Sequence, residues 1–221
     1  NGLSRYDGHF FTNFFHVPSD TASLGHNFIQ GILADKAGNI WVLHVMGLSC
    51  YNARYSGFIN YPIKQHYPHF SGSYFCFKLD MEGNIWIGNH NGLGIFNIQQ
   101  KKYLTSEEIN AKFGTQELNL GQACILGMAV GKNDDIWFNT KHQLYRWSNT
   151  DMHTKAMGWP AGEPVNPSLS INLIDTLAGE LYCGTYTNGL YVYNYNSNSW
   201  KHLNNGPAAQ RVKGYDPVKI I

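Results

Sequence analysis

The sequence contains few charged residues. Asp, Glu, Lys and Arg make up 14% of its 221 residues, whereas they account for about 25% of an average soluble protein. The 16 basic residues nearly balance the 15 acidic ones, and the basic residues are scattered rather than grouped in runs. Binding to nucleic acid or to an anionic membrane surface therefore lacks its usual electrostatic driving force, and we expect no nucleic-acid partner.

Long apolar segments and cysteine motifs are also missing. No apolar run approaches the roughly 20 residues that span a bilayer, and the first residues lack the charged and apolar regions of a signal peptide. If the full protein is exported, we expect its targeting segment to lie outside this chain. The four cysteines fall in different apolar runs without a CxxC spacing, which predicts buried free thiols and indicates no compartment. They are Cys50, Cys76, Cys124 and Cys183.

Apolar, aromatic and turn-forming residues are abundant instead. Hydrophobic residues make up 43% of the chain, which is enough to bury the core of one large all-β domain or two small ones. The chain contains 23 Gly and 23 Asn residues, together with 6 Trp, 14 Tyr and 12 Phe. This composition favours short strands joined by tight turns, with aromatic side chains packed between layers.

One pattern of about 45 residues occurs four times. A turn is followed by an apolar strand with a central aromatic residue, a short polar turn and a second apolar strand. The four copies are GNIWVLHVMGLSCYN, GNIWIGNHNGLGIFN, DDIWFNTKHQLYRWS and GELYCGTYTNGLYVYN, and their aligned aromatic residues are Trp41, Trp86, Trp137 and Tyr182. Consecutive aligned residues are 45, 51 and 45 positions apart.

Each copy predicts four antiparallel strands. An apolar run such as FIQGILAD or YFCFKLD precedes the turn, and another such as GFINYPI follows the second half. Four strands at a fixed period are typical of a β-propeller blade rather than a sandwich. We therefore expect an all-β propeller of four-stranded antiparallel blades, either as one domain over 1–221 or as part of a larger propeller. The predicted repeats are 1–23 (partial), 24–66, 67–117, 118–160, 161–205 and 206–221 (partial).

The first residues match only the second half of the repeat. NGLSRYDG corresponds to the third strand of a blade, and HFFTNFFHV corresponds to its outer strand. Two strands alone would leave apolar edges exposed. We therefore expect this half-blade to be completed by the C-terminal segment, by neighbouring residues outside this chain or by another chain.

The repeated aromatic residues have two interpretations. Packing between neighbouring blades would make Trp41, Trp86, Trp137 and Tyr182 a structural core. Repeated indoles could instead be stacking platforms, as in lectins or nucleic-acid-binding proteins. The fixed place of these residues inside an apolar strand favours the core.

The same residues resemble the two-component regulator propeller repeat. Its motif is an Asp, a Gly-Asn turn, Ile-Trp and a following Gly-Leu strand; residues 35–51 and 80–96 match it closely, 175–193 match it well and 131–147 match it more loosely. The resemblance implies the periplasmic sensor propeller of a bacterial hybrid two-component system that recognises an oligosaccharide. It also implies neighbouring domains in the full-length protein, namely a second propeller and a β-sandwich that leads to the membrane.

The turn between the second and third strands varies while the surrounding strands stay constant. In a propeller this turn shares a rim with the connections between blades, so its residues are candidates for a binding surface. Amide, imidazole and phenol groups beside aromatic rings suit a sugar ligand. The candidate ligand-binding residues in these turns are His44, His90, Asn91, Lys141, His142, Tyr186 and Asn188. The alternative is that each of them is a solvated turn residue.

Two long connections between repeats are expected on the same rim. Residues 105–122 begin with Thr105 and Glu108 in the spacing of a capping box, which predicts a short helix. Residues 152–168 contain Trp159 in a Gly- and Pro-rich context. An indole in such a loop is less suited to the core than the blade residues are, so Trp159 is a further candidate for lining a pocket or an interface.

Catalytic interpretations have weaker support. The repeated acids Asp35, Asp80 and Asp175 lie near structural turns on the opposite rim, whereas paired catalytic carboxylates need different environments. Acids that do not repeat keep a polysaccharide hydrolase or lyase open as an alternative, and these are Glu107, Glu108, Glu117 and Glu163. No P-loop, GxSxG or dinucleotide-binding pattern occurs.

A metal site has little support either. His44, His90 and His142 come from successive repeats and could converge, but they lack the local spacing of a metal-binding motif. We expect no catalytic residue, no metal and no cofactor.

The sequence therefore predicts a sensor or ligand-binding propeller without enzymatic activity of its own. The resemblance places it in the periplasm, as the extracytoplasmic part of an inner-membrane regulator. Its expected partners are an oligosaccharide and a neighbouring propeller or β-sandwich domain, with a homodimer as a further option. Apart from the enzyme, the other alternative is a structural propeller of the cell envelope or of a secretion system that binds protein.

Overall fold

The computed structural model describes most of the chain, and nearly all of its regular elements are β-strands. The described residues are 2–52, 57–70, 74–114, 119–120, 122–140, 143–158, 170–175, 177–185 and 189–203, without the side chains of 75 and 170–175. Within them, no helix has the length and apolarity to cross a membrane.

Four antiparallel sheets of four strands follow one another along the chain, and in each sheet the strands lie side by side in chain order. The first sheet contains β3 (Ile29–Ala34), β4 (Ile40–His44), β5 (Gly47–Asn52) and β6 (Gly57–Pro62). The second contains β7 (Tyr74–Leu79), β8 (Asn84–Asn89), β9 (Gly92–Asn97) and β10 (Lys102–Tyr103). The third contains β11 (Gly127–Val130), β12 (Ile136–Asn139), β13 (Leu144–Ser148) and β14 (His153–Met157). The fourth contains β15 (Ser170–Asp175), β16 (Glu180–Thr185), β17 (Gly189–Asn194) and β18 (Ser199–His202). This confirms the predicted all-β, propeller-like fold.

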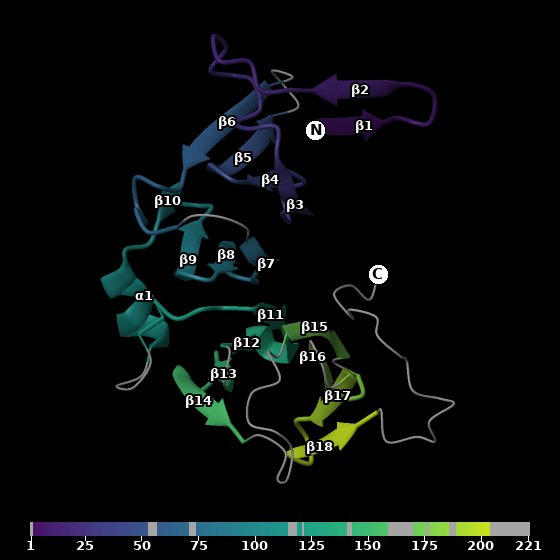
Figure 1. Cartoon of the computed structure of the whole chain (residues 1–221), viewed down its shortest axis with the longest axis vertical. Helices are drawn as coiled ribbons and strands as arrows, with labels where there is room; N and C mark the ends of the chain where they lie inside the picture. The colour runs from purple at the N-terminus through teal and green to yellow at the C-terminus, as the bar shows by residue number, and fades with distance from the viewer. Residues whose placement is uncertain are drawn as a thin grey trace.

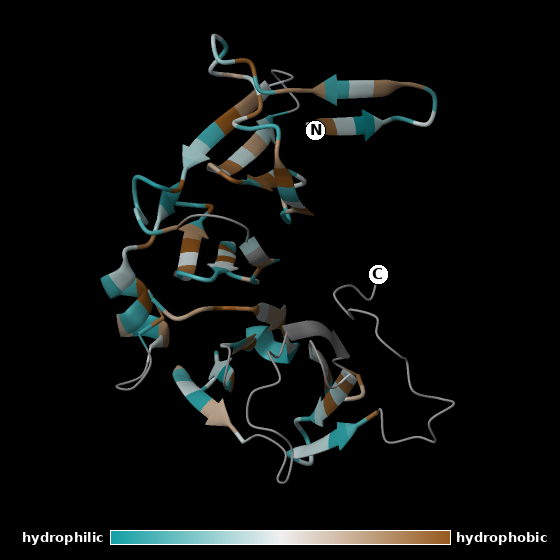
Figure 2. Cartoon of the chain, viewed as in Figure 1, coloured by the Kyte–Doolittle hydropathy of each residue, from teal (hydrophilic) through white to brown (hydrophobic). Residues whose placement is uncertain are grey.

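The four sheets are arranged as blades along an arc. Figure 1 shows the first strand of each sheet on the concave side and the fourth strand on the outer side. The first strands contact one another in order, β3 with β7, β7 with β11 and β11 with β15. The sheets therefore stack face to face, and Figure 2 shows that hydrophobic residues are concentrated in their strands.

The turn between the first and second strands is organised by an aspartate. Asp35 Oδ1 accepts hydrogen bonds from the backbone N–H groups of Ala37 and Asn39. Its Oδ2 accepts one from the indole of Trp41 at 2.9 Å. Burial alone would raise the pKa of Asp35, but the hydrogen bonds from Trp41 and Asn39 outweigh it and lower the pKa. Gly38 completes the turn with a φ of +81°, which a residue with a side chain adopts only with strain.

The second sheet repeats this turn with a more buried carboxylate. Asp80 accepts hydrogen bonds from the backbone N–H of Asn84 at 2.7 Å and from the Trp86 indole at 2.7 Å. Each aspartate therefore links a turn to the aromatic residue in the next strand and determines the direction of the indole. This accounts for the repetition of Asp35 and Asp80 without a catalytic role.

The hydrophobic core lies between the blades. The Trp41 ring of the first sheet is 5.4 Å from Phe96 of the second, and the Trp137 ring of the third sheet is 5.8 Å from Tyr193 of the fourth. Trp41, Trp86 and Trp137 are buried. Tyr182 differs from the other three, because it is only half-buried and its hydroxyl donates to Glu180 at 2.8 Å.

The four cysteines are free thiols in two environments. Cys76 and Cys183 are buried, as predicted, whereas Cys50 and Cys124 are only half-buried. Burial raises the pKa of the Cys76 thiol to about 12 and also raises that of Cys183.

A helix occupies the connection between the second and third sheets. Helix α1 (Ser106–Phe113) starts at the capping box formed by Thr105 and Glu108, which confirms the predicted helix. Phe113 at its end packs between Trp86 and Trp147, with ring centroids 4.5 and 4.9 Å away. The helix thus fills the space between two blades, beside the unusually short strand β10.

The N-terminal residues form a separate two-stranded sheet. Strand β1 (Leu3–Tyr6) pairs with β2 (Phe11–Phe14), as the predicted third and outer strands of a blade would. Leu3 and Phe14 pack against the first sheet beside Val42 and Phe58. The predicted C-terminal partial repeat, 206–221, lies outside the described residues.

We expect Trp86→Ala to lower the free energy of unfolding by about 3–5 kcal/mol, because it removes a fully buried aromatic ring between two blades. Trp86→Phe should cost about 1–3 kcal/mol, since the Asp80 carboxylate would lose a buried hydrogen-bond donor. Denaturant unfolding followed by circular dichroism measures both effects. Phe10→Ala, at a side chain that is 75% exposed, serves as the control and should change the free energy by less than about 0.5 kcal/mol. Equal stability of Trp86→Ala and Phe10→Ala would contradict the packing described here.

Candidate functional site

The turns between second and third strands share a rim with the connections between blades. The Ile63 N–H, at the start of a connection, donates to the carbonyl oxygen of Met46 in the first of these turns. In the second sheet, the Asn91 side-chain amide donates to the carbonyl oxygen of His69 at 2.9 Å. These bonds bring the variable turns and the connections together on one surface, the candidate binding surface, which we call the ligand rim.

A buried polar residue ends the second strand of every sheet on this rim. These residues are His44, Asn89, Asn139 and Thr185. Their side chains hold the adjoining turn: Asn89 Oδ1 accepts from the backbone N–H of Asn91 at 2.8 Å, and Thr185 Oγ1 donates to the carbonyl oxygen of Gly189 at 2.9 Å. The last residue of each second strand therefore supports the adjoining turn and belongs to the structural framework of the blade.

His44 belongs to this scaffold position and is only 2% exposed, which differs from the surface position expected from the sequence. Its Nδ1 accepts a hydrogen bond from the backbone N–H of Met46, and its Nε2 lies 2.9 Å from Ser49 Oγ. Ser49 Oγ in turn donates to Asn60 on the next strand. Both ring nitrogens have hydrogen-bond partners, so the imidazole holds the turn in place.

Two further histidines lie beside His44. The His26 ring centroid is 6.5 Å from that of His44, and the His16 centroid is 6.4 Å from that of His26. Burial lowers the pKa of His44 to about 4, and the proximity of His26 and His16 contributes. His44 is therefore neutral at pH 7.

At the second blade, the structure describes the exposed part of the ligand rim most completely. His90 is exposed, and its Nδ1 lies 3.3 Å from Cys124 Sγ at the entry to the third blade. Asn91 is half-buried and is tied to the exposed His69 through its backbone carbonyl. The structure thus brings the predicted His90 and Asn91 together with two groups that sequence reasoning missed, His69 and Cys124. The polar segment KQHYPH, in a connection between blades, was the available signal for His69.

The first strands of three sheets also contain a β-bulge close to this rim. The register shifts by one residue at Gln30 in β3, Phe75 in β7 and Asn172 in β15, near the end of each strand that faces the ligand rim. Such bulges change the direction of a side chain and are frequent beside binding sites. For Gln30 and Asn172, the only sequence signal is a polar residue that interrupts an apolar run.

Two buried polar atoms near the ligand rim lack a hydrogen-bond partner among the described residues. They are Oε1 of Gln30, at the bulge, and Nδ2 of Asn89, below His90 and Asn91. Buried polar groups in folded proteins are generally paired with protein or ordered water, so such atoms call for a partner. An acceptor at the first blade and a donor at the second are therefore buried and unpaired within the described part of the chain.

Several predicted site residues lie outside the described part of the chain. These are Lys141, His142, Trp159, Tyr186 and Asn188, together with the acids Glu117 and Glu163. Of the acids expected on the ligand rim, Glu108 caps α1 and lies 3.3 Å from Lys102, beside the turn between third and fourth strands. That turn belongs to the opposite rim, so the structure places Glu108 away from His90 and Asn91.

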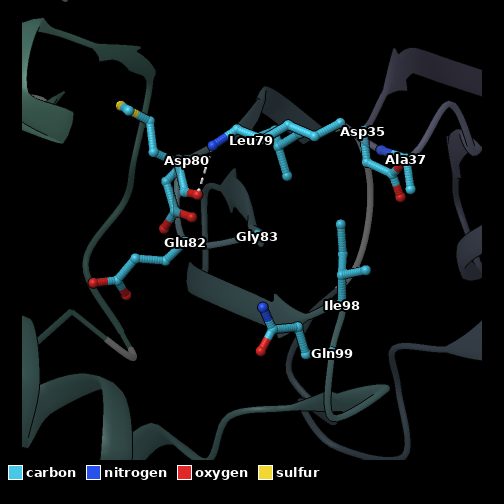
Figure 3. A pocket seen from close by; sticks show the side chains of 10 residues that line it. Asp35, Ala37, Leu79, Asp80, Glu82, Gly83, Ile98 and Gln99 are labelled. Carbon is cyan, nitrogen blue, oxygen red and sulfur yellow. Dashed lines mark hydrogen bonds between the residues drawn. The ribbon is translucent and has the colours of Figure 1, made fainter.

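A cavity of about 190 Å³ opens on the opposite rim, between the first and second blades. Figure 3 shows its lining, which combines Leu79 and Ile98 with the turn residues Asp35, Asp80 and Glu82. These acids already have partners: the first two hold indoles, and Glu82 lies 3.1 Å from Lys112. The carboxylates that line this cavity therefore hold turns and neighbouring elements of the fold together.

Metal binding finds no support in the side-chain arrangement. Among the residues with described positions, no group of three or more His, Cys, Asp and Glu side chains could hold a metal ion. His44 and His90 lie in separate hydrogen-bonded settings, with Ser49 and Cys124 respectively.

No family profile matches the chain, and no curated protein matches it in sequence. Solved structures do match it in fold. One is the extracellular domain of a protein described as a hybrid two-component system, BT3049 of B. thetaiotaomicron, with a TM-score of 0.61 and 17% identity over 95% of this chain. Another is PorZ, a surface component of the type-IX secretion system of Porphyromonas gingivalis, with a TM-score of 0.63 and 16% identity over 90% of this chain.

A third similar structure is an auxiliary nutrient binding protein of Bacteroides thetaiotaomicron, with a TM-score of 0.52 and 10% identity. The match covers 79% of this chain and 40% of that protein. The chain spans only 25% of the BT3049 domain and 30% of PorZ. At these identities the likeness shows the propeller-like fold of the chain.

The burial of His44 predicts a pH-dependent stability. In the unfolded chain the imidazole takes up a proton near pH 6.5, whereas in the folded chain it does so only near pH 4. The contribution of neutral His44 to the free energy of unfolding is therefore fully present above pH 6.5. It is lost as the pH falls from 6.5 to 4, by up to about 3 kcal/mol.

Denaturant unfolding at a series of pH values measures this loss. His44→Gln, which keeps an acceptor and a donor but cannot be protonated, should flatten the slope between pH 6.5 and 4. His153→Gln, at an exposed histidine of β14, should leave the slope as in the wild type. A slope that persists unchanged in His44→Gln would contradict the assignment.

Proposed function

We propose that this chain is a ligand-binding sensor propeller of a bacterial hybrid two-component regulator, located outside the cytoplasm. It recognises an oligosaccharide at the ligand rim and passes the signal to a transmitter in another part of the full-length protein. The chain itself has no enzymatic activity, and any kinase activity belongs to other domains.

The descriptions of the similar structures support the location and the sensor role. BT3049 is described as the extracellular domain of a hybrid two-component system, and the third similar structure as a nutrient binding protein. The resemblance to the two-component regulator propeller repeat is a second support, because it depends on the sequence alone. The similar structures and this resemblance together favour a receptor for small molecules outside the cytoplasm.

One observation on the molecule carries the proposal. The ligand rim presents His90 and Asn91 on a scaffold whose strands repeat from blade to blade, and the buried Nδ2 of Asn89 beneath them has no partner among the described residues. Imidazole and amide groups can donate to and accept from sugar hydroxyls. Variable groups on a constant framework are suited to selecting one ligand.

Recognition is completed, in this proposal, by rim residues outside the described part of the chain. Tyr186 and Trp159 supply flat aromatic faces for the C–H surfaces of a sugar, while Lys141, His142 and Asn188 add polar contacts. The further partners are a neighbouring propeller or β-sandwich domain of the same protein, or a second copy of the chain.

A second candidate function rests on PorZ, whose TM-score of 0.63 is as high as that of the BT3049 domain. PorZ is described as a surface component of a secretion system, so a structural propeller of the cell envelope that binds protein has comparable support from the fold. The ligand distinguishes the two functions: a sensor binds a small saccharide, whereas an assembly component does not require one.

Calorimetric titration with a panel of oligosaccharides tests the proposal. For a saccharide that binds, His90→Ala and Asn91→Ala should each weaken binding by about 1–3 kcal/mol, the cost of removing one buried hydrogen-bond partner. Tyr186→Ala should weaken it further through the lost aromatic face. Gln99→Ala, in the cavity on the opposite rim, is the matched control and should bind like the wild type.

Three outcomes would contradict the proposal. Unchanged affinity in the rim variants with weaker binding by Gln99→Ala would move the site to the opposite rim. Release of reducing ends from the bound saccharide would favour the enzyme. Absence of binding to every saccharide in the panel, with capture of a protein partner, would favour the structural propeller.

A further inference from the structure

On the opposite rim, the turns that join first and second strands meet between neighbouring sheets. At the interface of the second and third sheets, the side chain of Asp134 links two of these turns. Asp134 is only 4% exposed, and its Oδ1 accepts a hydrogen bond from the backbone N–H of Met81 at 2.8 Å. A carboxylate of the third sheet thus supplies an acceptor to a turn amide of the second sheet.

The interface of the first and second sheets has no side chain at the corresponding position. Aligning GNIW of the second repeat with DDIW of the third places Gly83 at the position of Asp134. Both residues have a positive φ, +83° and +63°. A Cβ at Gly83 would have open space around it, without an atom of another segment within 4 Å. The amide that corresponds to the N–H of Met81 belongs to Lys36, and glycine supplies no acceptor for it.

The cavity of about 190 Å³ lies at this position, and both Gly83 and Lys36 line it. Leu79 and Ile98 form apolar parts of its wall, as Figure 3 shows. An apolar cavity of about 150 Å³ holds one benzene molecule. The cavity between the first and second sheets therefore has room for a ring of that size with a small polar group.

The polar groups of the wall favour a ligand that accepts hydrogen bonds. The carboxylates of Asp35 and Asp80 already accept hydrogen bonds from indoles and from amides of their own turns. The ammonium group of Lys36 donates to the carbonyl oxygen of Met81 at 2.9 Å, and its three N–H bonds allow it to donate further. Gln99 adds a side-chain amide to the wall. An oxygen atom of a ligand can accept hydrogen bonds from these donors.

The charges around the cavity favour a neutral ligand over an anion. In the neighbouring interface, burial raises the pKa of Asp134, and the Asp80 and Glu82 carboxylates add to this, although a backbone hydrogen bond opposes it. A negative charge is thus disfavoured at that position. Three carboxylates and one ammonium group line the cavity itself, namely Asp35, Asp80, Glu82 and Lys36. An anionic ligand would therefore meet net repulsion.

We propose that the cavity between the first and second sheets is a binding site for a small neutral molecule that combines an apolar ring with a carbonyl oxygen. The ring packs against Leu79 and Ile98. The oxygen accepts a hydrogen bond from the backbone N–H of Lys36, as Asp134 accepts one from Met81 in the next interface. This site lies on the rim opposite to the ligand rim and does not depend on the proposed saccharide site.

Benzamide is a suitable probe because it joins a benzene ring to a neutral carbonyl group. It is titrated into the full chain, and the backbone amide signals are followed by heteronuclear NMR. We expect saturable shifts at Gly83 and Ile98 and the largest shift at Lys36, whose amide should also exchange more slowly with solvent. Benzoate has the same shape but a negative charge, so it should bind about tenfold more weakly.

Substitution of turn glycines tests the position of the site. Gly83→Asp introduces the residue that the third sheet has there, and aspartate tolerates a positive φ, as Asp134 shows. Its side chain should occupy the cavity and abolish binding at benzamide concentrations that saturate the wild type. Gly83→Asn should do the same, because occupation rather than charge excludes the ring.

The first sheet offers a matched control for these variants. Gly38 has the same place in its turn, a φ of +81° and equally open space around a Cβ, but it lies outside the lining of the cavity. Gly38→Asp should therefore bind benzamide like the wild type. Circular dichroism verifies that all three variants remain folded.

Other results would overturn the proposal. Absence of a saturable shift at the Lys36 amide up to the solubility limit of benzamide would show that the cavity takes no such ligand. Binding by Gly83→Asp and Gly83→Asn that equals that of the wild type would place the ligand elsewhere. Tighter binding of benzoate or of protonated benzylamine than of benzamide would show that the cavity selects a charged ligand.

Discussion

The hydrogen bond between a turn aspartate and the indole of the following strand is the constraint on which the rest of the structure depends. A carboxylate close to the core needs donors, and Asp35 and Asp80 obtain them from turn amides and from Trp41 and Trp86. One group therefore closes the turn, fixes the register of two strands and directs a large ring between two sheets. The third sheet holds Trp137 differently, under Arg146, which pairs with Asp135.

Because the rings point between sheets, the core is distributed along the interfaces of the blades. One cluster spans the first three sheets and another joins the third to the fourth. Each sheet thus gains stability from packing against its neighbours, as in other repeat proteins. The ends of the strands carry little of this packing, and one rim is free to vary in sequence without loss of the core. That separation of packing from the ligand rim is what the proposed binding function requires.

The sequence identified the turns that form the candidate site but not the environment of their side chains. The turn containing His90 and Asn91 differs from the others while the strands around it stay constant. His44 ends the second strand of the first sheet and is buried beside Ser49 and the distant His26, so its burial depends on contacts that no local pattern records. The bulge at Gln30 depends on pairing between strands. The contact between His90 and Cys124 depends on how two blades stack.

The sequence by itself determined the four-stranded repeat, the turns and the helix at Thr105, because these depend on spacing of apolar residues and on hydrogen bonds between residues close in the chain. It also indicated that β1 and β2 pair as a hairpin. Only the tertiary structure decided which polar groups of the turns are buried and that α1 inserts Phe113 between two sheets. Burial is a property of the surfaces that meet, and those surfaces come from segments distant in sequence.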